Sequence, residues 1–248
     1  MNHHRPIGIE TKMKKNLQEI LGILPILVKD VAISEEKLDN QDYSRRVYVR
    51  TLFAMIDGAA YSMKQAVFAI TRNLGNPGNL NDSDLVNLKE LTFFLDDNGE
   101  VREKKKYLRL PDNLKFTIES VNRVLGASIK LGIDTQDWTN FIRSVKIRNN
   151  ITHPKNLADL VISDKDLECI RSVNSWFNDI AVAMMAALKN FDWGKNVESN
   201  KNSPTEYKKE TWPTIPSGYN PNEGKCGWHF AQGYKEHIKR SRDIEERQ

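Results

Sequence analysis

Hydrophobic residues recur at helical spacing along most of this chain. In residues 12–31 the leucines, isoleucines and valines stand three or four positions apart, which predicts a helix that Pro25 kinks or splits. The same spacing predicts a long helix over residues 42–74, with Asn40 as its cap and the segment NLGNPGN as its end. A shorter helix is expected over residues 83–94, SDLVNLKELTFF.

Residues 93–110 interrupt this helical pattern. The turn sequence DDNG lies between two runs with some alternation of polar and apolar residues, which predicts a small hairpin-like insertion. Three further helices are expected after it: from Pro111 to Leu125, after a cap at Asp134 or Thr135, and after Ser163, which forms a capping box with Asp166. The predicted fold class is all-α, an antiparallel bundle of about five to six helices with one insertion.

The composition changes near residue 192. Residues 193–223 are rich in Asn, Ser, Pro, Lys and Gly and show no period. We therefore expect residues 1–191 to form the bundle domain and residues 192–248 to form a polar linker and tail, in which a short basic helix near the end fits the sequence.

Composition and cysteine spacing limit which classes of protein this chain can belong to. The chain has 248 residues, is 39% hydrophobic and carries 37 basic against 33 acidic residues, so net charge alone does not indicate a nucleic-acid binder. Cys169 and Cys226 lie far apart, which favours neither a disulfide framework nor a zinc site. His229 and His237 lack neighbours at metal-ligand spacing. With no signal peptide or membrane span in the sequence, we expect a cytoplasmic protein without a membrane partner, metal or cofactor.

The segment FIRSVKIRNNITHP, residues 141–154, carries the candidate chemistry. Helical geometry puts Trp138, Phe141, Ile142 and Val145 on one apolar face, and Asn149 falls near the centre of that face when it is extended. Arg148 and His153 fall on its two flanks. Because an ionised arginine is costly to bury without partners, this region is expected to be a groove, a satisfied polar network or a protein interface.

A purely structural interpretation of these two side chains is also open. An arginine and a histidine five residues apart arise readily by chance, and a histidine at a helix end is a good partner for the last carbonyls. A scaffold with a capped helix end would fit equally well.

The segment RNNITHP resembles the R-x-x-x-x-H signature of HEPN domains. The long predicted helix is also similar to one in several HEPN families, in the arginine-rich start, aromatic step and mid-helix acid of RRVYVRTLFAMIDGAAYSMKQ. The resemblance covers about residues 12–191. It implies a metal-independent, homodimeric endoribonuclease in which two copies of the motif face one another, as in HEPN toxins and defence effectors. RNA is then the expected partner, and an antitoxin or regulatory protein is a further partner class.

The residue types suit that chemistry. RNA can be cut by its own 2′-hydroxyl, so the protein must move protons and stabilise charge on the phosphorane. His153 would be the general acid and base, because an imidazole titrates near neutral pH. Arg148 would stabilise the phosphorane through its planar fork of donors, and Asn149 would orient one of them or contact the phosphate.

Supporting residues are predicted from two other segments. Asp57 lies in the apolar run LFAMIDGAAY and shares a helical side with Arg50, Phe53, Tyr61 and Lys64. A carboxylate in such a run needs a partner, so a purely structural ion pair is the favoured role. The functional alternative is that Asp57 holds Arg148 in place. The basic cluster REKKKYLR is either solvated surface or an RNA contact; Lys104, Lys105 and Lys106, with Arg50, are the candidate RNA-binding residues. The alternative function is a non-catalytic helical module that binds RNA, nucleotide or a partner protein.

Overall fold

The structure is a computed structural model that describes residues 15–39, 41–76 and 78–192. The chain divides into two compact units, and the helices belong to the first, which includes residues up to Lys89 and again from Tyr107. The described part of the second unit is the segment Glu90–Lys106. The predicted cap Asn40 and the predicted tail beyond residue 192 lie outside the described residues.

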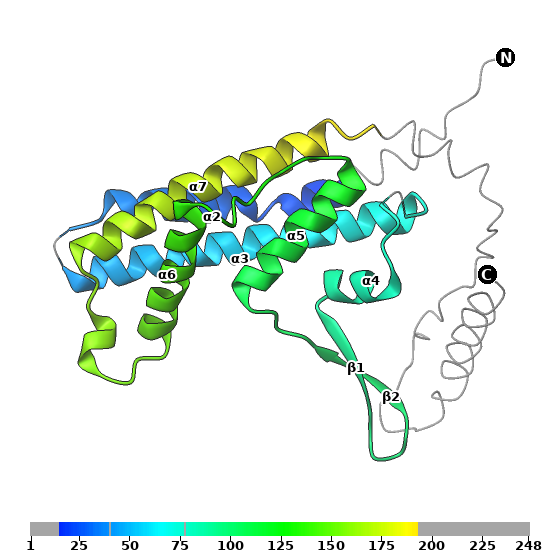
Figure 1. Cartoon of the computed structure of the whole chain (residues 1–248), viewed down its shortest axis with the longest axis horizontal. Helices are drawn as coiled ribbons and strands as arrows, with labels where there is room; N and C mark the ends of the chain where they lie inside the picture. Colours follow the sequence, from blue (N-terminus) through cyan, green and yellow to red (C-terminus); the bar gives the residue numbers. More distant parts are fainter. Residues whose placement is uncertain (1–14, 40, 77, 193–248) are drawn as a thin grey trace. The chain divides into compact units, whose positions relative to one another are not determined.

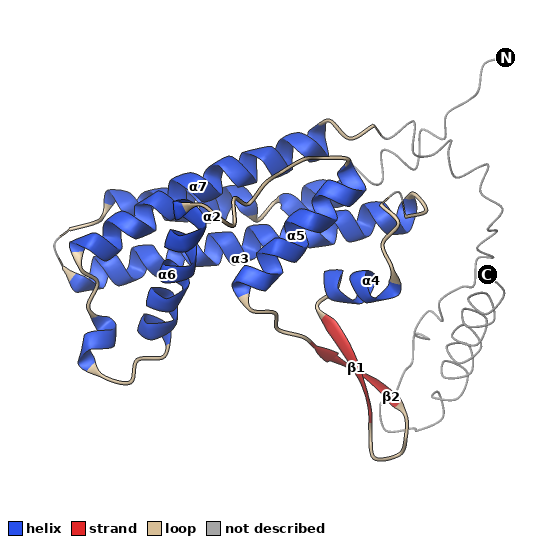
Figure 2. Ribbon diagram, viewed as in Figure 1, coloured by secondary structure: helices blue, strands red, loops and turns tan. Residues whose placement is uncertain are grey.

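The first unit is a helical bundle, which confirms the predicted all-α class (Figure 1 and Figure 2). Its α-helices are α2 (Leu24–Glu36), α3 (Asp42–Asn73), α4 (Asp82–Leu88), α5 (Leu110–Leu125), α6 (Gln136–Thr152) and α7 (Asp164–Lys189), and a short 3₁₀ helix, η1 (Leu157–Leu160), precedes α7. Residues 15–21 are also helical. The long helix α3 contacts α2, α4, α5, α6 and α7, so it is the central element of the bundle.

Local sequence signals explain most of the helix ends. Pro25 lies in the first turn of α2, so the predicted helix over residues 12–31 is split rather than kinked. The predicted capping box of Ser163 and Asp166 is present at the start of α7. Gly126 ends α5 with a positive φ of 65°, a conformation that glycine adopts without strain.

One predicted boundary is wrong. The helix expected over residues 83–94 extends too far: α4 ends at Leu88, and residues 91–94 lie in strand β1, Leu91–Leu95. Phe93 and Phe94 were also part of the predicted hairpin. Glu90 has a positive φ of 55°, which breaks the helix, and β1 pairs antiparallel with β2, Val101–Lys105. Apolar runs this short fit helix and strand equally well, and here the pairing partner decides between them. The hairpin predicted within residues 93–110 is confirmed.

An aromatic cluster packs α6 against α3 and α7. Phe141 is fully buried, and its ring centroid lies 6.4 Å from Phe53, 5.2 Å from Trp138 and 5.3 Å from Trp176. Phe53 is also buried, and its ring stacks on Phe141. This cluster fixes how α6 is rotated about its own axis.

We predict that Phe141→Ala destabilises the protein strongly. Truncating a fully buried phenylalanine removes its apolar burial and leaves a cavity, so the free energy of unfolding should fall by about 3–5 kcal/mol. Urea unfolding followed by circular dichroism measures this change. The matched control is Tyr43→Ala on α3. Tyr43 is 68% exposed, so this substitution should shift the free energy of unfolding by no more than about 0.5 kcal/mol. Equal effects of the two substitutions would contradict the role of the cluster.

None of the helices in the described part of the chain is long and apolar enough to cross a membrane.

Candidate functional site

The candidate site begins where α6 ends. Pro154 disfavours helical geometry at the residue before it, and His153 accordingly leaves the helix with φ −129° and ψ 60°. Its N–H still donates to the Asn149 carbonyl at 2.9 Å. Arg148 therefore lies in the last complete turns of α6, and His153 is the first residue beyond the helix.

Arg148 continues the buried stripe of α6. Phe141, Ser144 and Ile151 are buried on this helix, and Arg148 falls between the last two at helical steps of four and three residues. Asn149 is exposed instead. The prediction that Asn149 lies near the centre of the packed face is thus wrong, because the buried stripe runs through Phe141, Ser144 and Ile151, while Ile142 and Val145 are only partly buried against the core.

Residues of α3 hold the Arg148 guanidinium. Its Nη2 donates to Asp57 Oδ2 at 3.2 Å, and the group lies 5.5 Å from the centroid of the Phe53 ring. Nη1 donates to Asn149 Oδ1, also at 3.2 Å. Phe53 and Asp57 are one helical turn apart, so a ring and a carboxylate orient the same cation. The contact expected between Asp57 and Arg148 is present, and its part in function remains a prediction.

The protein satisfies the Arg148 guanidinium only in part. Its Nε is buried and has no hydrogen-bond acceptor within the described residues, and the two bonds above are long for charged groups. The Arg148 side chain is 25% exposed and that of Asp57 is 48% exposed. Since an ion pair this open to water contributes only about 0–1 kcal/mol, an incoming anion can compete with Asp57 for this cation.

The other residues predicted to share a side of α3 divide between the core and the surface. Lys64 is fully buried, and its Nζ donates to Asn113 Oδ1 at 2.6 Å. Tyr61 is exposed. Lys64 therefore belongs to the core of the bundle and not to the surface around Arg148.

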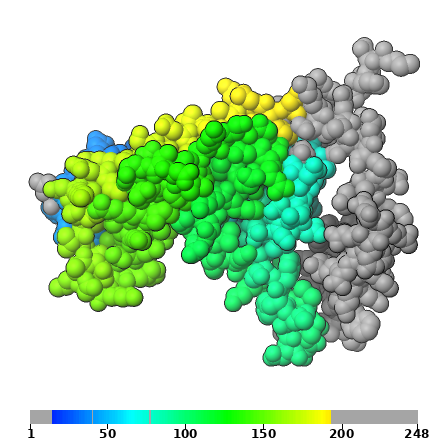
Figure 3. All heavy atoms as spheres, in the orientation of Figure 1, coloured from blue at the N-terminus to red at the C-terminus, as the bar shows by residue number. Residues whose placement is uncertain are grey.

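His153 lies on an ordered connector. Its side chain is exposed, and its imidazole has no hydrogen-bond partner in the part of the chain that the structure describes. Beyond it, Asp159 Oδ2 accepts the N–H groups of Lys155 at 2.7 Å and Asn156 at 3.2 Å. Asn156 and Asp159 also form a capping box on η1. In the space-filling view this connector and α6 form part of the visible surface (Figure 3).

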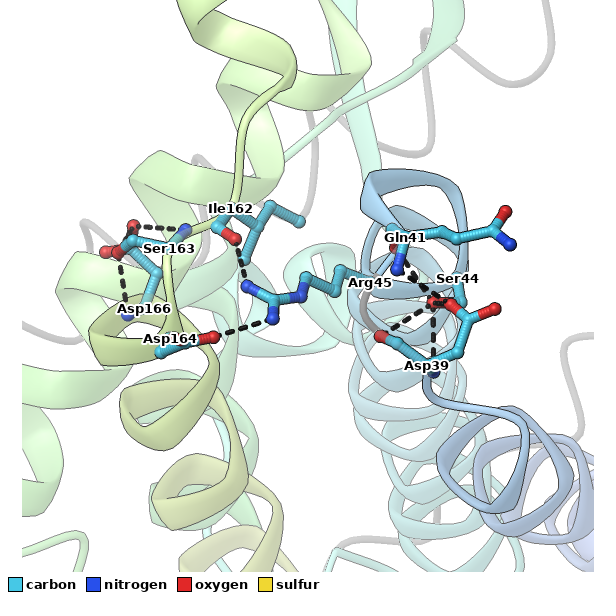
Figure 4. A network of polar contacts seen from close by, with 8 residues as sticks. All are labelled: Asp39, Gln41, Ser44, Arg45, Ile162, Ser163, Asp164 and Asp166. Carbon is cyan, nitrogen blue, oxygen red and sulfur yellow. Dashed lines mark hydrogen bonds and ion pairs between the residues drawn. The ribbon is translucent and has the colours of Figure 1, made fainter.

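Three arginines of α3 fasten the connector to the bundle; we refer to them as the arginine clamp. Their guanidinium groups donate to main-chain carbonyls at its two ends: Arg50 to Ile151 at 2.8 Å, Arg46 to Leu160 at 2.9 Å and Arg45 to Ile162 at 2.7 Å. Arg45 also pairs with Asp164 at 2.6 Å (Figure 4). Arg50 was predicted to bind RNA, and its contact with the last turn of α6 gives it a structural role as well.

The start of α7 is held by a second polar network. Asp166 accepts from Ser163 and from Arg143 Nη2 at 2.6 Å (Figure 4 shows Ser163 and Asp166). Burial raises the pKa of the Asp166 carboxyl, but the hydrogen bonds from Ser163 and Arg143 outweigh it and hold the pKa below its usual value. An ionised Asp166 therefore fixes the point where the connector joins α7.

The predicted basic cluster does not form one patch. Lys104 and Lys105 are neighbours on β2, so their side chains leave opposite faces of the hairpin. Lys106 follows the strand and donates its N–H to the Glu90 carbonyl at 2.7 Å. All three belong to the second unit of the chain, whereas Arg148, Asn149 and Asp57 meet within the first.

Comparisons with protein-family models, with curated proteins and with solved structures find no match for this chain. In the described ranges, no three His, Cys, Asp or Glu side chains are grouped closely enough to hold a metal ion.

Proposed function

We propose that this protein is a cytoplasmic endoribonuclease of the HEPN type that cuts RNA without a metal ion. The observation that supports the proposal is the end of α6, where Asp57 and Phe53 orient a guanidinium with an unsatisfied buried Nε. Five residues further on, an exposed imidazole begins a clamped connector. A guanidinium matches phosphate oxygens, and an imidazole moves protons near neutral pH.

The proposed reaction uses the nucleophile that RNA carries. The 2′-oxygen attacks the adjacent phosphorus, so an O2′–P bond forms while the P–O5′ bond breaks. The proton of the 2′-hydroxyl passes to one imidazole, and a protonated imidazole gives a proton to the 5′-oxygen. The products are a 2′,3′-cyclic phosphate and a 5′-hydroxyl. Arg148 stabilises the charge on the phosphorane. Asn149 and Asp57 keep the Arg148 guanidinium in place.

The proposed site is shared by two copies of the chain. Arg148 faces α3, and positions five residues apart on a helix diverge by about 140°. Neither a hydrogen bond nor an ion pair joins Arg148 to His153 within the described residues. Two helix ends that face each other supply both groups to one phosphodiester. The resemblance of RNNITHP to the HEPN signature further implies a toxin or defence effector that an antitoxin or regulatory protein restrains.

One observation favours a second function. The guanidinium already binds Asp57 and Asn149, which is also how a purely structural arginine is held. A non-catalytic module that binds RNA, nucleotide or a partner protein fits this arrangement.

Two matched oligonucleotides test the proposal. The purified chain should cut an end-labelled RNA in the presence of EDTA and leave a cyclic phosphate, because neither the nucleophile nor the proton transfers require a metal. The same sequence with 2′-O-methyl groups should stay intact, because its nucleophile is blocked.

Three results would count against the proposed reaction. Binding of the RNA without any cleavage would favour the non-catalytic module. Cleavage of the 2′-O-methyl strand, or activity that EDTA removes, would contradict the proposed chemistry.

A further inference from the structure

The hairpin of the second unit has two very different edges. Strand β1 (LTFFL) contains no charged residue, whereas β2 (VREKK) contains four. The two strands form a two-stranded sheet, so within the described residues each has one edge without a partner strand. An edge strand exposes unpaired N–H and C=O groups, and charged side chains are the common protection against further pairing. Only β2 has that protection.

Apolar side chains of β1 are exposed on both faces of the hairpin. Phe93 is 43% exposed and Phe94 is 48% exposed, and these neighbours point to opposite faces. Leu95 is 68% exposed, and its cross-strand partner Val101 is 42% exposed. A two-stranded hairpin is marginal in water unless more strands or a packed face support it. The exposed apolar strand therefore favours addition of another strand to the β1 edge.

Several hydrogen bonds fix the turn of the hairpin. Asp96 accepts hydrogen bonds from the N–H groups of Asn98 and Glu100, and from Arg102 Nε at 2.8 Å. Gly99 has a φ of 74° and closes the turn with a bond to the Asp96 carbonyl at 2.9 Å. The Arg102 hydrogen bond is the main reason that the pKa of Asp96 lies below its usual value. Little backbone order has to be gained when another strand pairs with it.

The charges of the hairpin do not favour RNA as the occupant. The four cations among residues 91–107 are balanced by four carboxylates, Asp96, Asp97, Glu100 and Glu103. Arg102 is already paired with Asp96 and Glu100. A polyanion would thus meet little net positive charge.

We propose that β1 pairs with β1 of a second copy of this chain, antiparallel and about a two-fold axis at Phe93. The result is a four-stranded sheet in the order β2-β1-β1-β2. The symmetry places Phe93 opposite Phe93, Thr92 opposite Phe94 and Leu91 opposite Leu95, so no charges meet and two aromatic rings form a cross-strand pair. The same operation on β2 would put Glu103 opposite Glu103 and Arg102 opposite Lys104, which like-charge repulsion disfavours.

This inference goes beyond the ribonuclease proposal and does not depend on it. Its test is the mass of the full-length protein in solution, measured by sedimentation over a range of concentrations. Phe93→Lys places two ammonium groups opposite each other across the axis and should lower the assembled mass, because copies that only this sheet joins then separate. The control is Val101→Lys, which adds the same charge on the same face of the hairpin but on β2, and should leave the mass unchanged.

A charge swap makes the test specific for pairing at Phe93. The variants Phe93→Lys and Phe93→Glu should each fail to assemble through β1, and an equal mixture of the two should recover the wild-type mass. A wild-type protein that sediments as a monomer overturns the proposal, as does a Phe93→Lys protein with unchanged mass. Loss of RNA binding in Phe93→Lys at unchanged mass would overturn it too and would assign the hairpin to RNA.

Discussion

His153→Ala is expected to reduce RNA cleavage by about 10²–10⁴-fold, the usual contribution of a positioned general acid or base. Its stability should hardly change, because the side chain is exposed and its imidazole has no hydrogen-bond partner in the described ranges of the chain. We expect the free energy of unfolding to stay within about 0.5 kcal/mol of the wild-type value. Single-turnover cleavage and urea unfolding, measured on the same preparations, separate the two effects.

Lys155→Ala is the matched control for His153→Ala. Lys155 is an exposed cationic residue of the same connector as His153, and its bond to Asp159 is made by its main chain. This variant removes positive charge near His153 but no proton-transfer group, so it should weaken RNA binding slightly and leave the rate of the bound complex unchanged. If the two variants lose activity equally, His153 acts through charge alone. A His153→Ala protein that keeps a tenth or more of the activity would contradict its catalytic role.

The bundle could be predicted because its signals are local. Pro25 separates the first two helices, Ser163 and Asp166 cap α7, and the turn DDNG closes the hairpin. In each case the residues that carry the signal lie within about four positions of the structure they determine. Residues 91–92 were assigned to a helix, and Phe93 and Phe94 to both a helix and a hairpin, because their apolar run is compatible with both states. The choice between the two states is made by β2, whose residues 102–105 face residues 91–94 across the hairpin. That information lies outside any local window.

The candidate site could be predicted in its members but not in its geometry. Sequence reasoning named Arg148 and Asp57, and the structure brings them within 3.2 Å. It placed Asn149 near the centre of the packed face by extending the face of Trp138, Phe141, Ile142 and Val145, whereas the buried stripe runs through Phe141, Ser144 and Ile151. Rotation about a helix axis depends on the shapes of distant partners, which a hydrophobic pattern does not contain.

The arginine clamp left no clear signal in the sequence. Two of its members are visible as the pair Arg45–Arg46, but their acceptors are main-chain carbonyls of a connector more than a hundred residues away. A carbonyl group carries no residue type, so no pattern could reveal these contacts. The capping box of Asn156 and Asp159 did have a local signature, an Asn followed three residues later by an acid. It is the feature that could have predicted an ordered connector after His153.

The second large effect is expected for Arg148→Ala. Losing a preorganised donor to developing negative charge typically costs about 10²–10³-fold in rate, and the proposed composite site predicts how this loss combines with that of His153. Each variant alone should be nearly inactive. If Arg148 of one copy acts with His153 of the other, a mixed dimer of Arg148→Ala and His153→Ala chains retains one complete pair.

Mixed dimers can be isolated with two different affinity tags and compared with each parent variant. Cleavage well above that of either parent is the expected result, because the His153→Ala chain supplies the guanidinium and the Arg148→Ala chain supplies the imidazole. A mixed dimer as inactive as its parents would mean that both groups must come from one chain or that both pairs are needed.

The control for Arg148→Ala is Arg148→Lys, because an ammonium group keeps the charge but not the planar fork. Partial activity of Arg148→Lys would assign the effect to charge. Full loss of activity would assign it to two-point contact with the phosphate.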